Sequence, residues 1–432
     1  MPTTAIDVFE RLPAYDRSMA ADQKKEVFDL SRFQKFLDRI RNPEKGLPVI
    51  HVTGSKGKGS ISALIGSGLQ ALGKNVGVFI SPYLHSPLES IFVGGQPISI
   101  EKFSVLMNRY QAVIDRLPPS QFVTGFEVLT AIALQHFHDE DVDFAVMETG
   151  LGGRLDATNV IESPVISIIG AIEKEHSDIL GGNITSVAFE KLGIVREDTP
   201  VIIAPQKDLM IADFIKTYCL QKPAPCLSVR GTYESTVLDR SANGYSFRLN
   251  APTRTINRIQ LALTGEHQIE NAMTAWAVLD QLMPDFDQEQ VLETWSYLTL
   301  PGRFETRIKD GRELILDGAH TPESAIALRK TLDDVYGGEP ITFMISFLND
   351  KNVEGVIRNL VRWGDAVVFT QVDHPRSLPA RLIEARVKDF LNKQKVTYAI
   401  TNNLRIAWQK VIKMSSRSPI CVTGSFKLIE KV

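Results

Sequence analysis

Short apolar runs alternate with segments of helical periodicity, and this alternation constrains the fold more than any other feature of the sequence. Residues 48–53 form a β-branched run that leads into glycine-rich sequence, and residues 60–72 then follow a helical pattern that ends at Gly73. Strands separated by helices pair in parallel, so we expect an α/β fold with a mostly parallel sheet covered on both faces. Further strands are expected at residues 76–80, 144–147, 165–169 and 200–204, and a further helix at 127–138.

The pattern changes twice in the second half of the chain. Alternating polar and apolar residues at 227–263 predict a small antiparallel addition. After a linker-like segment at 299–303, a second α/β set is expected, with strands at 313–316, 341–345, 366–370, 396–400 and 420–423. A single core rarely exceeds about 250–300 residues, and this chain has 432. We therefore expect one domain at residues 1–298 and a smaller Rossmann-like domain at residues 302–432.

Composition excludes several functional classes. A net charge of −3, from 48 basic and 51 acidic residues, provides no general positive field for nucleic acid or an anionic membrane. No segment reaches the roughly 20 apolar residues that a membrane-spanning helix needs, and residues 1–21 do not resemble a signal peptide. Cys219, Cys226 and Cys421 lack the spacing of a zinc site and are expected to be free thiols. The sequence thus predicts a cytoplasmic protein.

The glycine-rich segment at residues 54–60 stands between a predicted strand and a predicted helix. In that context Gly54, Gly57 and Gly59 let backbone N–H groups surround a phosphate, while Lys58 reaches its oxygens and the helix N-terminus adds positive potential. The segment departs from the usual phosphate-loop pattern because Gly59 separates Lys58 from the hydroxyl of Ser60. The alternative is a glycine-rich turn with solvated lysines.

Three more polar residues are candidates for the same site. Glu148 ends an apolar strand, at the sheet edge where α/β folds bind ligands, and a carboxylate beside a phosphate loop can hold Mg²⁺. His176 follows the run at 165–169, and Lys191 lies in helical sequence. Taken one by one, these residues also fit a locally satisfied acid, a surface histidine and a solvated helix lysine.

The order of the motifs resembles the folylpolyglutamate synthase / dihydrofolate synthase family of the Mur ligase superfamily. Residues 51–60 are similar to that family's phosphate loop, with Ser55 and Lys56 where threonine and asparagine are usual. Residues 150–159 are similar to its Gly-Leu-Gly-Gly-Arg-Leu-Asp-Ala-Thr-Asn signature, the most specific of the motifs. Other motifs similar to those of the family occur, in the family's order, at residues 81–84, 176–181, 190–194, 267–272, 301–305, 317–320 and 422–425.

The resemblance implies an ATP-dependent ligase that joins L-glutamate to a folate-type carboxylate through an acyl phosphate and releases ADP and phosphate. It implies ATP and two Mg²⁺ ions, and dihydropteroate or folate as the acceptor. A monomer is also expected. Its implied ATP ligands are Gly54, Gly57, Lys58, Gly59, Ser60, Asn271, Arg303 and Asp317. Its implied metal ligands are Ser81, Glu148, His176 and a carbamylated Lys191. Its implied substrate contacts are Thr124, Phe126, Glu127, Leu155, Asp156 and Ala157 for the pterin, and His320 and Ser425 for glutamate.

Departures from the family pattern leave alternatives open. Ser90 and residues 173–175 differ from the family where folate contacts are expected, and Thr321 replaces an asparagine. A ligase for nucleotide-linked peptidoglycan precursors would carry an extra N-terminal domain, for which the 53 residues before Gly54 are expected to be too few. A ligase for another small carboxylate and a non-catalytic ATP-binding protein remain alternatives. Within the family, the choice between making dihydrofolate, extending a polyglutamate tail, or both stays open.

Overall fold

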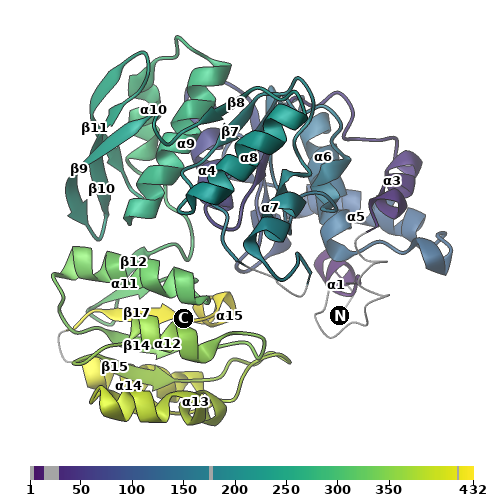
Figure 1. Cartoon of the computed structure of the whole chain (residues 1–432). Coiled ribbons are helices and arrows are strands. Elements are labelled where there is room, and N and C mark those ends of the chain that lie inside the picture. The colour runs from purple at the N-terminus through teal and green to yellow at the C-terminus, as the bar shows by residue number, and fades with distance from the viewer. Residues whose placement is uncertain (1–3, 14–28, 175–178, 416–417) are drawn as a thin grey trace. The chain divides into compact units, whose positions relative to one another are not determined.

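The computed structural model describes residues 4–13, 29–174, 179–415 and 418–432, and the chain forms two compact units (Figure 1). The first unit comprises Met1–Ser235, Leu249–Ile256 and Glu270–Trp295, and the second comprises Thr236–Arg248, Asn257–Ile269 and Ser296–Val432. Two internal pieces therefore belong to the second unit, whose continuous part begins at Ser296. The domain limits at 298 and 302 stay a prediction.

An eight-stranded sheet forms the centre of the first unit. Its strands are β1 Val49–Thr53, β2 Val76–Phe79, β3 Ile91–Val93, β4 Gln96–Pro97, β5 Phe144–Glu148, β6 Ile166–Ile169, β7 Val201–Ile203 and β8 Cys226–Ser228. They lie in the order β4-β3-β2-β5-β1-β6-β7-β8, with parallel pairing everywhere except at the β3 and β4 edge. All five residues of β1 are buried, as expected for a central parallel strand. The predicted fold class is confirmed.

Helices cover this sheet, and several of them begin at a residue whose side chain caps the helix. They are α1 Ala5–Glu10, α3 Leu30–Arg39, α4 Lys58–Ala71, α5 Ile100–Ile114, α6 Gly125–Asp139, α7 Ile184–Leu192, α8 Leu209–Gln221, α9 Glu266–Leu282 and α10 Gln288–Trp295, with 3-10 turns η1 Pro87–Ser90, η2 Pro119–Gln121 and η3 Ala157–Val160. Thr124 caps α6 and Asn183 caps α7, each by accepting a hydrogen bond from a backbone N–H of the first turn.

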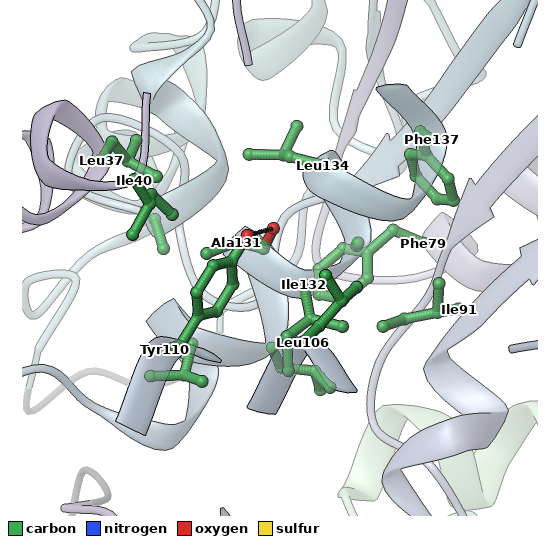
Figure 2. Packing of buried hydrophobic residues seen from close by; sticks show 14 of the residues in the cluster. Leu37, Ile40, Phe79, Ile91, Leu106, Tyr110, Ala131, Ile132, Leu134 and Phe137 are labelled. Carbon is green, nitrogen blue, oxygen red and sulfur yellow. Dashed lines mark hydrogen bonds between the residues drawn. The ribbon is translucent and has the colours of Figure 1, made fainter. Parts of the chain in front are cut away.

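The core beside β2 and β3 shows how the helices are held (Figure 2). Leu37 of α3, Leu106 of α5, Ile132 of α6 and Phe79 of β2 belong to one hydrophobic cluster, and all four residues are at most 3% exposed. Burying a side chain of this size contributes about 1.5–3 kcal/mol. The cluster fixes the start of α6 over the sheet, and α6 begins where the resemblance expects the pterin.

The second unit is built on a six-stranded sheet. Its strands are β12 Glu305–Lys309, β13 Arg312–Leu316, β14 Thr342–Ile345, β15 Ala366–Phe369, β16 Thr397–Ile400 and β17 Ile420–Thr423, in the order β12-β13-β17-β14-β15-β16. Only β12 pairs antiparallel within this sheet. Its helices are α11 Pro322–Tyr336, α12 Val353–Leu360, α13 Ala380–Lys393, α14 Leu404–Ser415 and α15 Phe426–Ile429. The second α/β set is where the sequence predicted it.

A small sheet occupies the segment for which an antiparallel addition was predicted. It consists of β9 Glu234–Ser241, β10 Gly244–Asn250 and β11 Thr255–Leu261, with β10 in the middle. None of the helices in the described ranges is long and apolar enough to cross a membrane.

Candidate functional site

The glycine-rich segment forms the turn between β1 and α4, as predicted. Ser55 N–H donates to Ala171 O at 2.8 Å and Ser55 Oγ donates to Glu173 O at 2.9 Å, so the turn is attached to the segment that follows β6. Helix α4 begins at Lys58. The first N–H groups of a helix have no intrahelical acceptor, and together with the helix dipole they form an anion-binding site. The geometry suits a phosphate.

Gly57 has a backbone conformation that only glycine adopts easily. It is the N-cap of α4 with φ of 80°, in the left-handed region. A Cβ there would lie 2.3 Å from Oδ1 of Asn271, a residue of α9. The structure thus brings Asn271, an expected ATP ligand far away in the sequence, against the phosphate loop.

Substituting Gly57 with alanine is expected to damage nucleotide binding specifically. The positive φ costs about 1–2 kcal/mol for an L-residue, and the methyl group displaces Asn271. We expect the KM for ATP to rise about tenfold. Gly73→Ala is the matched control, because Gly73 has φ of 78° but nothing within 4 Å of its Cβ position. An equal rise in the KM for ATP in both variants, measured by steady-state ADP release, would contradict this account.

Two lysines converge on one carbonyl of the loop. Lys58 Nζ donates to Gly54 O at 3.1 Å, and Lys191 Nζ donates to the same oxygen at 2.8 Å. Lys191 is 1% exposed, which is unusual for a lysine. It lies at the end of α7, so the interpretation of a solvated helix lysine is wrong for this residue. Both Nζ atoms therefore lie beside the loop in which a phosphate would bind.

Glu148 lies beside the same loop, at the end of β5. Its carboxylate is 2% exposed, and Oε1 is 3.9 Å from Lys58 Nζ while Oε2 accepts a hydrogen bond from Ser81 N–H at 3.0 Å. A Cβ on Gly59 would lie 3.4 Å from Oε2, so the carboxylate faces the first turn of α4. Glu148 and Ser81, two expected metal ligands, are therefore neighbours.

The residues present fit a divalent cation that also binds phosphate. A carboxylate has about four lone-pair positions, so Glu148 can accept from Ser81 and still contact Mg²⁺, which takes oxygen ligands. His176 lies outside the described residues. Within those residues no three His, Cys, Asp or Glu side chains gather as a metal cluster. A cation at Glu148 would thus depend on hydroxyl and phosphate oxygens as well, as Mg²⁺ sites beside nucleotides do.

The start of α6 carries three of the expected pterin contacts. Thr124 and Glu127 form a capping box, in which Glu127 Oε2 accepts from Thr124 N–H at 2.7 Å. Arg32 of α3 donates to both carboxylate oxygens of Glu127, at 2.9 and 2.7 Å. Burial raises the pKa of Glu127, and Arg32 opposes that rise. Phe126 lies over residues 150–159, here called the signature loop, because a Cβ on Gly150 would be 2.4 Å from the Phe126 ring.

The other expected pterin contacts lie in the turn η3 and just before it. Asp156 is 4% exposed and Ala157 is 7% exposed, and Leu155 is half-buried. Turn η3 contacts α6. The elements that carry the two groups of expected pterin contacts are therefore neighbours, although these residues are about 30 positions apart in sequence.

Four expected site residues belong to the second unit and gather at one edge of its sheet. Asp317 follows β13 and accepts from Phe304 N–H and Ala319 N–H, both at 2.9 Å. His320 Nδ1 donates to Gly318 O at 2.7 Å, which leaves Nε2 as the acceptor of the neutral ring. The Arg303 guanidinium lies 4.8 Å from the centre of the Phe426 ring, next to Ser425, which caps α15. Their roles stay predictions.

Several polar residues near the phosphate loop and the start of α6 were not predicted from the sequence. His51 and Thr53 of β1 are fully buried, and Thr53 Oγ1 donates to Gly152 O at 2.6 Å. A signal for them existed, since polar residues in a fully buried strand need hydrogen-bond acceptors or donors. Arg32 gave no such signal, because an arginine on an amphipathic helix is usually exposed.

Comparison with known proteins supports this arrangement. Residues 52–279 match the Mur ligase middle domain, and residues 302–432 match the dihydrofolate synthetase C-terminal domain. The chain is 31% identical to the dihydrofolate synthetase of Saccharomyces cerevisiae, over 92% of this chain and 95% of the relative.

Two solved structures of folylpolyglutamate synthases have a fold similar to that of this chain. The folylpolyglutamate synthase of Mycobacterium tuberculosis complexed with ADP superposes with a TM-score of 0.86, at 29% identity over 98% and 95% of the two chains. A bifunctional folylpolyglutamate synthase/dihydrofolate synthase of Yersinia pestis, complexed with AMPPNP and a Mn ion, gives 0.80 at 25% identity over 98% and 95%. The chain belongs to the folylpolyglutamate synthase / dihydrofolate synthase family of ATP-dependent ligases.

Proposed function

We propose that this chain uses ATP to attach L-glutamate to a pterin-bearing carboxylate, and that dihydropteroate is its preferred acceptor. The observation that carries the ligase function is the convergence of Lys58 and Lys191 on Gly54 O, with Glu148 beside Lys58. The match of residues 302–432 to the dihydrofolate synthetase C-terminal domain and the similarity to the yeast dihydrofolate synthetase favour dihydropteroate.

The chemistry requires an activated carboxylate. A carboxylate is a poor acyl donor, because oxide is a poor leaving group. Transfer of the γ-phosphoryl group of ATP to it gives an acyl phosphate, which the amino group of glutamate attacks to form an amide and release phosphate. Such transfers depend mainly on positioning and on neutralising charge.

In this scheme the residues of the loop bind the phosphates. The N–H groups of Gly57, Gly59 and Ser60 surround the phosphate oxygens, and Lys58 neutralises their charge. Glu148, with Ser81 and His176, would hold Mg²⁺, and a carbamylated Lys191 would support a second ion. Bound Mg²⁺ offsets the charge that accumulates on the transferred phosphoryl group. Asn271 would contact the nucleotide from α9.

The acceptor and the incoming amino acid would use the remaining residues. Thr124, Phe126 and Glu127 of the α6 start and the segment Leu155–Ala157 would contact the pterin. Arg303 and Asp317 of a domain at residues 302–432 would contribute to ATP binding, and His320 and Ser425 to glutamate binding. We further propose a cytoplasmic monomer.

One assay tests the function and the acceptor together. Purified protein is incubated with ATP, Mg²⁺ and L-glutamate, and with either dihydropteroate or tetrahydrofolate, and both ADP release and product mass are measured. We expect a glutamate-dependent product from dihydropteroate, with a higher kcat/KM than tetrahydrofolate gives. If neither acceptor supports ADP release, the proposed ligase function is contradicted. A product from tetrahydrofolate alone would contradict the acceptor preference.

A further inference from the structure

Two polar side chains of β1 form hydrogen bonds with the loop at residues 150–159. His51 and Thr53 are two residues apart, so they point to the same face of the strand. His51 Nε2 is 2.8 Å from Thr158 Oγ1, and Thr53 Oγ1 donates to Gly152 O at 2.6 Å. Strand β1 thus contacts both ends of the loop that contains Asp156, and the same strand leads into the phosphate loop.

The direction of each hydrogen bond follows from the donors available. Thr158 Oγ1 carries one hydrogen and donates it to Asp156 Oδ1 at 2.6 Å. It must therefore accept from His51, so neutral His51 carries its hydrogen on Nε2. Burial lowers the pKa of His51 to about 3, consistent with a neutral ring. His51 Nδ1 is buried and has no hydrogen-bond donor among the residues that the structure describes.

Asp156 receives hydrogen bonds on both oxygens. Oδ1 accepts from Thr158 N–H at 3.0 Å and from Thr158 Oγ1, and Oδ2 accepts from Leu151 N–H at 2.8 Å. Burial raises the pKa of Asp156, whereas these hydrogen bonds lower it and favour the carboxylate. The bond from Thr158 Oγ1 is the shortest of the three, and the same hydroxyl oxygen is 2.8 Å from His51 Nε2.

We propose that His51 and Thr158 are positioning residues, which orient the Asp156 carboxylate for the pterin-bearing substrate without touching that substrate. This inference rests on the proposed function, because Asp156 is an expected pterin contact. It assigns a role to a histidine of the central strand and links the strand of the phosphate loop to the acceptor side of the site.

The test compares Thr158→Val with Thr158→Ser. Valine has the shape of threonine but lacks the hydroxyl, whereas serine keeps it. A lost hydrogen bond to a charged group should raise the KM for dihydropteroate about 10–100-fold in the valine variant, with the KM for ATP unchanged. The serine variant and Thr331→Val should behave like the wild type. Thr331 is a matched control, because its buried hydroxyl donates to Ala327 O in the second unit.

A conservative change of the histidine adds a second variant. His51→Gln keeps an N–H donor for Thr158 Oγ1, so the KM for dihydropteroate should stay closer to the wild-type value than in Thr158→Val. An unchanged KM for dihydropteroate in Thr158→Val would overturn the proposal. So would an equal rise in the KM for ATP, which would indicate a general loss of structure.

A readout without substrate separates this inference from the proposed function. In protein labelled with ¹⁵N-histidine, the His51 ring nitrogens, assigned by their loss in His51→Gln, should show hydrogen on Nε2 in the wild type and an altered pattern in Thr158→Val. A ring with hydrogen on Nδ1 would overturn the inference even in an active enzyme. If the wild type forms no product while this pattern holds, the proposed function fails and the hydrogen-bond chain stands.

Discussion

Replacing Lys191 with alanine is expected to lower kcat by a factor of about 10²–10³, the loss typical when one electrostatic stabiliser of a transition state is removed. Lys191 is 1% exposed and its Nζ donates to Gly54 O at 2.8 Å. Its loss removes from the phosphate loop either a positively charged ammonium group or, if the lysine is carbamylated, a carboxylate that supports a metal ion. Lys216→Ala, at an exposed position of α8, is the control and should keep full activity. Single-turnover ADP formation measures the effect.

Rescue distinguishes a carbamate from a plain ammonium group. Burial favours the neutral amine that reacts with CO₂, and the product Nζ keeps one hydrogen, with which it can still donate to Gly54 O. If Lys191 is carbamylated, a short carboxylate such as acetate should restore part of the activity of Lys191→Ala. A folded variant, shown by an unchanged circular dichroism spectrum, that no short carboxylate restores would argue against the carbamate.

Glu148→Gln is expected to reduce kcat/KM for ATP by about 10²–10³ and to raise the Mg²⁺ concentration needed for half-maximal rate. The amide oxygen of glutamine can still accept from Ser81 N–H, so the local structure should persist. What is lost is the negative charge beside Lys58 and the cation. Removal of divalent cations with a chelator should abolish the activity of the wild type.

The control for this substitution is Glu101→Gln, in the exposed first turn of α5. It changes the net charge of the protein by the same amount but should leave the Mg²⁺ dependence unchanged. Identical Mg²⁺ titrations for Glu148→Gln and the wild type would show that Glu148 does not hold the cation.

The parallel strands were predictable because their sequences are short, β-branched and separated by long helical segments. The expected run at residues 144–147 became Phe144–Glu148, and the run at 420–423 was found unchanged. Strands β3, β4 and β8, which lie toward the two ends of the sheet, were not predicted. They have two or three residues each, and no apolar run as long as the one at residues 200–204 marks them in the sequence.

The candidate site was predictable where one segment carries its own signal. Glycine at 57 and lysine at 58 indicated a phosphate loop from their place between a strand and a helix. The pair formed by Arg32 and Glu127 was not predictable, because it joins residues about 95 positions apart on two helices and depends on their packing.

The second unit consists of three separate segments of the chain, and this limits how the protein can be cut into fragments. Glu266 forms ion pairs with Arg240 and Lys330, and Tyr245 OH donates to Asp334 Oδ2 at 3.4 Å, all within that unit. A recombinant fragment that starts at residue 302 would leave Lys330 and Asp334 of α11 facing water where Glu266 and Tyr245 now contact them. A continuous C-terminal fragment that keeps both inserted pieces would therefore also carry Leu249–Ile256 and Glu270–Trp295, which belong to the first unit.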